Sequence, residues 1–275
     1  MPETKVYPAF RDINRTFPDP DLSSLPVVSL VGTYSKGWQV EPHAHQRGQL
    51  LLVTSGSMRV ETKDGSWITP PGRACWIPSK ATHKVTYTQA AEMQTALIVP
   101  ELLDGLPKHC CVIKLTPLLR ELVLQAVAID NQYSLHSREH RLMQVLIDQI
   151  GLAQETPLFL PEGRDPRLRR VTESLHRNPG DDRNIEEWAQ LAGASARTLA
   201  RLFQKETGMT FSAWRQQLCL IRAVEMLIEG QSITNIALAL GYESTAGFTS
   251  MFSRTMGESP SNYLTRLSQD KPVTK

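Results

Sequence analysis

The sequence contains no apolar run of about 18 residues, the length that a helix needs to cross a bilayer, so we expect no membrane-spanning segment. Residues 1–20 are polar, include four prolines and lack the apolar stretch of a secretory signal. Only four cysteines are present, and their spacing fits no metal-binding pair. These absences argue against membrane and disulfide-rich secreted proteins and predict a cytoplasmic protein with reduced thiols.

The chain also lacks an excess of charge of one sign. A net charge of +2 does not by itself indicate a protein that binds nucleic acid. The hydrophobic and charged fractions, 41% and 21%, are those of an ordinary globular protein. A length of 275 residues predicts one or two domains, each long enough to bury its own core.

The C-terminal half repeats one pattern of isoleucine, alanine, glycine, phenylalanine and glycine. The two copies are Ile185, Ala189, Gly193, Phe203, Gly208 and Ile233, Ala237, Gly241, Phe252, Gly257. Their spacing is identical except for one extra residue between the first glycine and the phenylalanine of the second copy. A short helix that ends at a glycine and is followed by a second helix is typical of a helix-turn-helix, and two copies are too few for a solenoid.

Each second helix begins after a serine that can serve as N-cap, Ser195 or Ser244, and has apolar residues along one face only. The opposite face is then free to contact a partner; a plain helical bundle with a chance repeat is the alternative. Residues 211–229 between the copies have a helical pattern and predict a rod of about 28 Å. That length is close to the ~34 Å between major-groove segments on one side of DNA.

Several motifs of this half resemble the AraC/XylS family of transcription regulators. They are residues 195–203 and 206–208 in the first copy, and residues 239–244 with Phe248, Phe252, Gly257, Pro260 and Tyr263 in the second. The chain departs from the family at Leu264, where an arginine is frequent, and at residues 245–247, which are small. The resemblance implies that the protein binds double-stranded promoter DNA, is located in the nucleoid and forms a homodimer. It also implies contact with RNA polymerase if the protein is an activator, which is the commoner role in the family.

The exposed faces of the two second helices supply the candidate DNA contacts. Arg197 and Arg201, four residues apart, are predicted to read bases, since an arginine can donate two hydrogen bonds to guanine. Ser195, Thr198 and Gln204 are predicted to support them through polar or phosphate contacts. In the second helix the side chains are shorter, so Ser244, Thr245, Thr249 and Ser250 are predicted to contact phosphates or thymine methyl groups. Arg254 is a candidate phosphate contact. A solvated helix face is the alternative for each arginine.

The N-terminal half changes to short strand patterns separated by turn residues. The predicted strands are residues 27–31, 49–53, 58–62, 67–69, 74–77, 84–88 and 94–99. Strands of this number and spacing predict a sandwich or a small barrel.

This region contains a resemblance to the first cupin motif, carried by His43, His45 and Gln49. Gln49 stands where a glutamate is usual. His83, further downstream, is a possible partner histidine. Because alternate strand residues share a face, His43 and His45 are expected to point the same way. The four residues are candidate ligands of a divalent transition metal. Two alternatives are a metal-free effector pocket, which adds Trp76 to the four residues, and a purely structural role. No cofactor is required by the sequence.

The predicted organisation follows from these patterns. The segments are an N-terminal arm (1–25), a cupin-like effector barrel (26–115), a helical pair for dimerisation or for packing on the barrel (116–154), a linker (155–165), a DNA-binding domain with two helix-turn-helix motifs joined by a helix (166–267), and a tail (268–275).

The sequence therefore predicts an α+β multidomain, sequence-specific transcription regulator, most simply an activator, without enzymatic activity. Its barrel is predicted to sense a small effector or to mediate dimerisation. The alternative is a cupin metal-dependent oxygenase or isomerase with a helical appendage, in which the histidines would leave an open coordination position.

Overall fold

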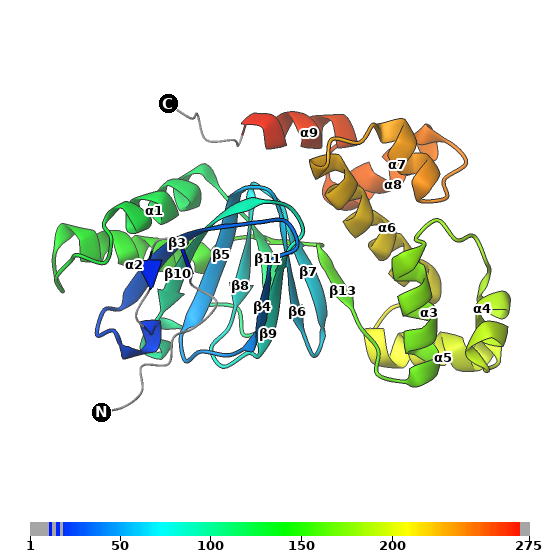
Figure 1. Ribbon diagram of the computed structural model, residues 1–275, viewed down its shortest axis with the longest axis horizontal. Coiled ribbons are helices and arrows are strands. Elements are labelled where there is room, and N and C mark those ends of the chain that lie inside the picture. The colour runs from blue at the N-terminus through cyan, green and yellow to red at the C-terminus, as the bar shows by residue number, and fades with distance from the viewer. Residues whose placement is uncertain (1–10, 13–14, 17–18, 270–275) are drawn as a thin grey trace. The chain divides into compact units, whose positions relative to one another are not determined.

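The computed structural model describes residues 11–12, 15–16 and 19–269 (Figure 1). Most of the predicted arm and most of the predicted tail lie outside these residues. The described chain forms two units, one of residues up to 62 with residues 69–156, the other of residues 63–68 with residues 157–269. The boundaries predicted from the sequence stay a prediction.

Two antiparallel sheets form the β-rich part of the chain. The six-stranded sheet has the order β12 (Glu155–Thr156), β11 (Cys111–Lys114), β8 (Arg73–Ile77), β5 (Gly48–Ser55), β10 (Ala91–Ile98) and β3 (Val27–Tyr34). The five-stranded sheet has the order β13 (Phe159–Pro161), β7 (Gly65–Thr69), β6 (Met58–Thr62), β9 (His83–Tyr87) and β4 (Gln39–His43). A further pair consists of β1 (Arg11–Asp12) and β2 (Arg15–Thr16). All seven predicted strands are present; β4, β11, β12, β13 and the pair β1 and β2 are additional.

Two helices cover one face of the six-stranded sheet: α1 (Pro117–Ala128) and α2 (Arg138–Gly151) (Figure 1). Both begin at a side-chain cap, because Thr116 accepts a hydrogen bond from Leu119 N and Ser137 accepts one from His140 N. The core under them is built from alternate residues of the central strands, such as Leu50 and Leu52 of β5. This face of the sheet is therefore closed by the helices.

The segment predicted as a linker contains two short strands. Strand β12 pairs with β11, and β13 pairs with β7 in the register Phe159↔Trp67. Pro161 ends β13 at the edge of its sheet, where the missing N–H costs no ladder hydrogen bond. Trp214 Nε1 donates to Pro161 O and Gln217 Nε2 donates to Phe159 O, so the segment is held by side chains of a helix downstream.

The C-terminal part of the second unit is helical. Its helices are α3 (Pro166–Arg177), α4 (Ile185–Ala192), α5 (Ala196–Thr207), α6 (Phe211–Ile228), α7 (Ile233–Ala239), α8 (Thr245–Met256) and α9 (Pro260–Gln269). Helices α4 and α5 form the first predicted pair and α7 and α8 the second, and α6 connects them (Figure 1). Gly193 follows α4 at φ 69° and Gly241 follows α7 at φ 76°, a left-handed conformation that glycine adopts most readily.

Aromatic side chains pack against the buried faces of both second helices, α5 and α8. Phe203 of α5 lies against Phe211 and Trp214, with ring centroids 5.4 Å and 5.8 Å away. In the second copy, Phe252 of α8 contacts Phe248 and Tyr263 in the same manner. The repeated phenylalanine thus anchors each second helix by its inner face.

No helix within the described chain is long and apolar enough to cross a membrane.

Candidate functional site

Helix α5 presents two arginines on its solvent side. Ser195 caps the helix, accepting a hydrogen bond from Thr198 N at 3.2 Å, and Leu199 and Phe203 are fully buried. Arg197 and Arg201 are exposed, and neither has a hydrogen bond or ion pair among the described residues. Because residues four apart lie on the same side of a helix, both guanidinium groups project from one exposed face of α5.

The predicted supporting residues of α5 divide into two groups. Ser195 and Thr198 share a hydrogen bond between their hydroxyl oxygens at 3.0 Å, at the exposed start of the helix. Gln204 instead donates to Gly208 O at 3.2 Å and so satisfies a carbonyl beyond the helix end. The hydroxyl groups of the first two therefore lie together at the start of the helix, whereas the Gln204 amide is occupied by its carbonyl partner.

Helix α8 has the same cap and the same buried face but a different exposed surface. Ser244 accepts a hydrogen bond from Gly247 N, and Phe248, Met251 and Phe252 are buried. When the caps Ser195 and Ser244 are superposed in sequence, Ala246 takes the place of Arg197 and Ser250 takes that of Arg201.

The remaining candidates in α8 are exposed or partly exposed. Thr245, Ser250 and Arg254 are exposed, and Thr249 is half-buried. Arg254 and Ser250 border a cavity of about 510 Å³ that is also lined by Arg215 and Tyr242. The second helix therefore offers short hydroxyl side chains and one arginine near its end.

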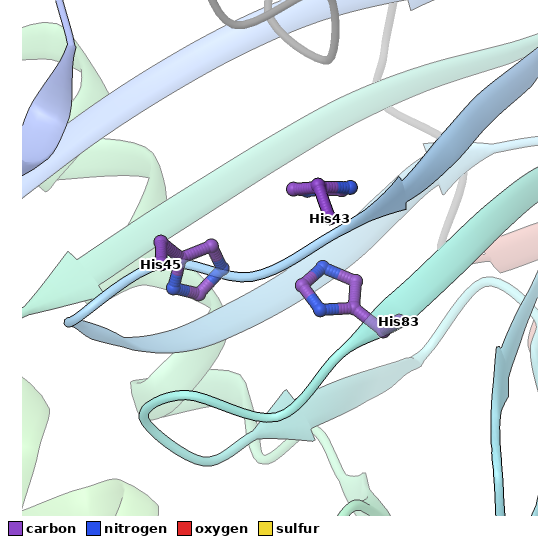
Figure 2. A group of neighbouring side chains, drawn as sticks. All are labelled: His43, His45 and His83. Carbon is purple, nitrogen blue, oxygen red and sulfur yellow. The ribbon is translucent and has the colours of Figure 1, made fainter.

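Three histidines gather at one end of the five-stranded sheet (Figure 2). His43 ends β4 and His83 begins β9, and the two are direct partners in the antiparallel register. His45 lies beyond the end of β4, so the face that it shares with His43 does not come from strand alternation. The ring centroids of His43 and His83 are 4.3 Å apart, and those of His45 and His83 are 5.2 Å apart.

Each ring is oriented by a backbone carbonyl at Nδ1. The acceptors are Glu41 O at 2.9 Å for His43, Arg47 O at 2.6 Å for His45 and Ala81 O at 2.8 Å for His83. Because a carbonyl oxygen only accepts hydrogen bonds, each Nδ1 is protonated and each neutral ring has its lone pair on Nε2.

Burial keeps two of these rings neutral. Desolvation lowers the pKa of His43, the hydrogen bond to the Glu41 carbonyl raises it by a smaller amount, and the electrostatic interaction with His45 lowers it. Desolvation, followed by repulsion from His43, lowers the pKa of His83 to about 3. At neutral pH, His43 and His83 therefore present unprotonated nitrogen atoms.

Gln49 joins the cluster and Trp76 does not. Gln49 Oε1 lies 2.9 Å from His45 Nε2, and its amide donates to Thr95 Oγ1 at 3.1 Å. Trp76 is the register partner of Leu50, on the face of the six-stranded sheet covered by α1 and α2, and its indole donates to Pro107 O. The strand alternation that turns Gln49 toward the histidines turns Trp76 away, so we leave Trp76 out of the site.

Comparison with known proteins identifies the chain's relatives. The family model "AraC-like ligand binding domain" matches residues 26–146, and the model "Helix-turn-helix domain" matches residues 188–266. The HTH-type transcriptional regulator NimR of Escherichia coli (strain K12) is 35% identical over 230 residues, covering 84% of each protein. The chain belongs to the AraC family.

Two further comparisons are with more distant proteins. The HTH-type transcriptional activator RhaR of Mannheimia succiniciproducens is 21% identical over 242 residues, covering 82% of this chain and 87% of the relative. A solved structure of ToxT from Vibrio cholerae aligns with 88% of this chain and 98% of its own length, at 11% identity and a TM-score of 0.38. The predicted family, fold class and regulatory function are confirmed: this AraC-family protein is a DNA-binding transcription regulator with an N-terminal ligand-binding domain.

Sequence reasoning missed two residues that complete the surroundings of these sites. Arg215 of α6 lines the same cavity as Arg254, although the two are far apart in sequence. Thr95 of β10, fully buried, links Gln49 to Leu50 O. A position inside a helical pattern or a strand pattern gives no signal for either residue, because tertiary packing alone brings them to the site.

Proposed function

We propose that this AraC-family chain binds a promoter site by placing α5 and α8 in two successive major-groove segments. The exposed pair Arg197 and Arg201 is the observation that carries the proposal. Helix α6, with 18 residues, is a rod of about 27 Å, a suitable spacer for two reading helices about one turn of DNA apart.

In this arrangement the two helices have unequal tasks. Arg197 and Arg201 read bases, since each guanidinium can bind guanine O6 and N7. Ser195 and Thr198 contact the phosphate backbone at the start of α5, with Gln204 recruited from its carbonyl partner. In α8, Ser244, Thr245, Thr249 and Ser250 contact phosphates or thymine methyl groups. Arg254, which lines the same cavity as Arg215, neutralises a phosphate next to α8.

The barrel senses a small molecule near the histidine cluster. His43, His45, His83 and Gln49 are the polar side chains that converge there, and the matching family model describes a ligand-binding domain. A group of buried polar atoms with fixed orientation provides the specificity that an effector site needs.

The protein acts as a homodimeric activator that contacts RNA polymerase at promoters in the nucleoid. Support for activation comes from the relative RhaR, which is named a transcriptional activator. Support for a dimer comes from the exposed apolar side chains on the helical pair, Leu118 of α1 and Val145 of α2, which are 52% and 42% exposed. The relatives reported above are regulators, so we favour no enzymatic role for the barrel.

The test is selection of genomic DNA fragments by the full-length protein, followed by hydroxyl-radical footprinting of the selected sites. The proposal expects protection of two segments on one side of the duplex, about 10 base pairs apart. Protection of a single short segment, or binding without sequence preference, would refute the two-groove arrangement.

A further inference from the structure

The cavity of about 510 Å³ beside α8 lies within the C-terminal unit and is lined by α6, by α8 and by the turn that follows α7. Its volume falls within the ~300–1,000 Å³ that is usual for small-molecule sites. The proposed DNA contacts involve only Ser250 and Arg254 at this cavity. They leave its other walls unexplained.

Two arginines without partners give the cavity wall its positive charge. Arg215 of α6 is half-buried and Arg254 of α8 is exposed, and neither has a hydrogen bond or ion pair among the described residues. No aspartate or glutamate is found among the described residues that line the cavity. A partly buried guanidinium group in a recess without an acidic partner favours an anionic ligand.

The electrostatic influence of both arginines meets at one wall residue, Tyr242. Burial raises the pKa of the Tyr242 hydroxyl to about 12, and the charges of Arg215 and Arg254 each act in the opposite direction. An anion beside this residue therefore interacts with both guanidinium groups.

The carboxylate of Asp181, outside the cavity, does not consume this charge. Arg215 contributes to the lowered pKa of Asp181, but the hydrogen bond from Arg183 is its largest cause. Arg183 Nε donates to Asp181 Oδ1 at 2.8 Å, so this carboxylate already has a cationic partner. The guanidinium group of Arg215 remains available to a ligand.

The remaining walls of the cavity offer apolar surface. Phe211, Leu240 and Met251 line it and are buried within the unit. The ring of Tyr242 packs edge to face against Phe248, with centroids 5.6 Å apart, which fixes this wall. A DNA phosphate needs only an exposed cation, whereas an apolar recess beside two arginines suits a molecule with an apolar body and one anionic group.

We propose that this cavity binds a small organic anion. Arg215 and Arg254 hold its carboxylate or phosphate group, and Phe211 and Met251 contact its apolar body. A guanidinium group can donate two parallel hydrogen bonds to either kind of anionic group. The exposed hydroxyl of Ser250, at the same wall, adds a further donor.

The bound anion opposes DNA binding by α8. Ser250 and Arg254 belong both to the cavity wall and to the proposed DNA contacts, so a guanidinium group held by the anion is withdrawn from the phosphate. Each ligand then lowers the apparent affinity of the other. This competition rests on the proposed function, whereas the binding of the anion rests only on the cavity.

The first experiment is an NMR titration of the full-length protein, without DNA, with phenylacetate, phenyl phosphate and the neutral analogue phenylacetamide. We expect both anions to bind and phenylacetamide to bind at least about 10-fold more weakly, since a hydrogen bond to a charged group contributes a factor of about 10–100. Equal binding of phenylacetate and phenylacetamide would overturn the role of the arginines. Inorganic phosphate that binds as tightly as phenyl phosphate would contradict the apolar wall.

Arg215→Gln assigns the binding to this cavity rather than to the barrel. We expect it to weaken phenylacetate binding by about 10–100-fold and to leave phenylacetamide binding unchanged. Arg177→Gln removes an exposed arginine of α3 that does not line the cavity, and this matched control should bind phenylacetate like the wild type. Phenylacetate binding that neither substitution alters, or that both weaken equally, would overturn the proposal.

Gly247 of α8 allows the cavity to be filled without removing a charge. A Cβ atom there would lie 3.5 Å from Ser244 Oγ and 3.9 Å from Tyr242 Cδ1, at ordinary contact distances, and a helix favours alanine or leucine over glycine. Gly247→Ala should keep phenylacetate binding and Gly247→Leu should abolish it, with the folding of both checked by thermal unfolding. A folded Gly247→Leu protein with wild-type binding would contradict the site.

Competition is measured on genomic fragments selected by the protein, at fixed ionic strength, with phenylacetate replacing chloride. We expect phenylacetate, but not phenylacetamide, to lower the affinity for DNA. Anion binding without this effect would overturn the competition and count against the DNA contacts of α8. If no anionic probe binds and Arg215→Gln weakens binding to all DNA sequences, the cavity holds a DNA phosphate; this would overturn the organic-anion site and leave the proposed function standing.

Discussion

The backbones of Gly180 and Gly241 lie so close that a Cβ atom on Gly241 would be 2.6 Å from the carbonyl oxygen of Gly180. Gly241 also has a φ of 76°, a conformation that side-chain-bearing residues rarely adopt. The turn between α7 and α8 thus needs a glycine for two reasons, one local and one from packing.

Gly241→Ala is therefore expected to destabilise the C-terminal unit more than Gly257→Ala. Gly257 has the same φ of 76° but nothing within 4 Å of its Cβ position, so its substitution costs only the conformational part, about 1 kcal/mol. The clash at Gly241 should add about 1–3 kcal/mol. Chemical denaturation of both variants measures the difference in free energy of unfolding; equal losses would show that the contact with Gly180 relaxes without cost.

Arg201→Ala is expected to lower affinity for the selected operator by about 1–3 kcal/mol, with little change for unrelated DNA. The reason is that the exposed, unpaired guanidinium is assigned to a base rather than to a phosphate. Lys205→Ala, an exposed cation on the same helix, is the matched control and should weaken all sequences alike. Binding is measured at fixed salt over a panel of operator variants. A uniform loss for Arg201→Ala would make it a phosphate contact.

Ser250→Arg is expected to create a new base preference in the DNA segment under α8. Ser250 occupies the position of Arg201 in the repeat and is exposed, so the longer side chain fits without disturbing the core. The gain for a guanine at the contacted position should be about 1–3 kcal/mol. Asn262→Arg on α9 adds the same charge at another exposed place. If both variants raise affinity equally for all sequences, the effect is only electrostatic.

Leu118→Asp is expected to dissociate the proposed dimer with little change in the free energy of unfolding, because Leu118 is 52% exposed. Leu135, 58% exposed in the connection between α1 and α2, supplies the matched control Leu135→Asp, which should stay dimeric. Sedimentation equilibrium gives the mass of each variant. A Leu118→Asp protein with the wild-type mass would remove α1 from the interface.

Much of this architecture could be predicted because its signals are local. Ser195 and Ser244 were recognisable as caps, the repeated glycines as turns, and the alternating runs as strands. Strand β4 was missed because Glu41 and Pro42 interrupt its pattern at a register shift, and only pairing with β9 makes it a strand. The histidine cluster was partly predictable from spacing, but the exclusion of Trp76 depends on which face of β8 the helices cover. Base contacts stay predictions, since they depend on DNA.

The difference between the exposed surfaces of α5 and α8 has a consequence for the promoters themselves. A control region recognised by this protein should be asymmetric. The half contacted by α5 should have a fixed base sequence, and the half contacted by α8 should tolerate base substitutions. Point changes in the tolerant half would then adjust the strength of regulation gradually, whereas a single change in the fixed half would release the gene from control.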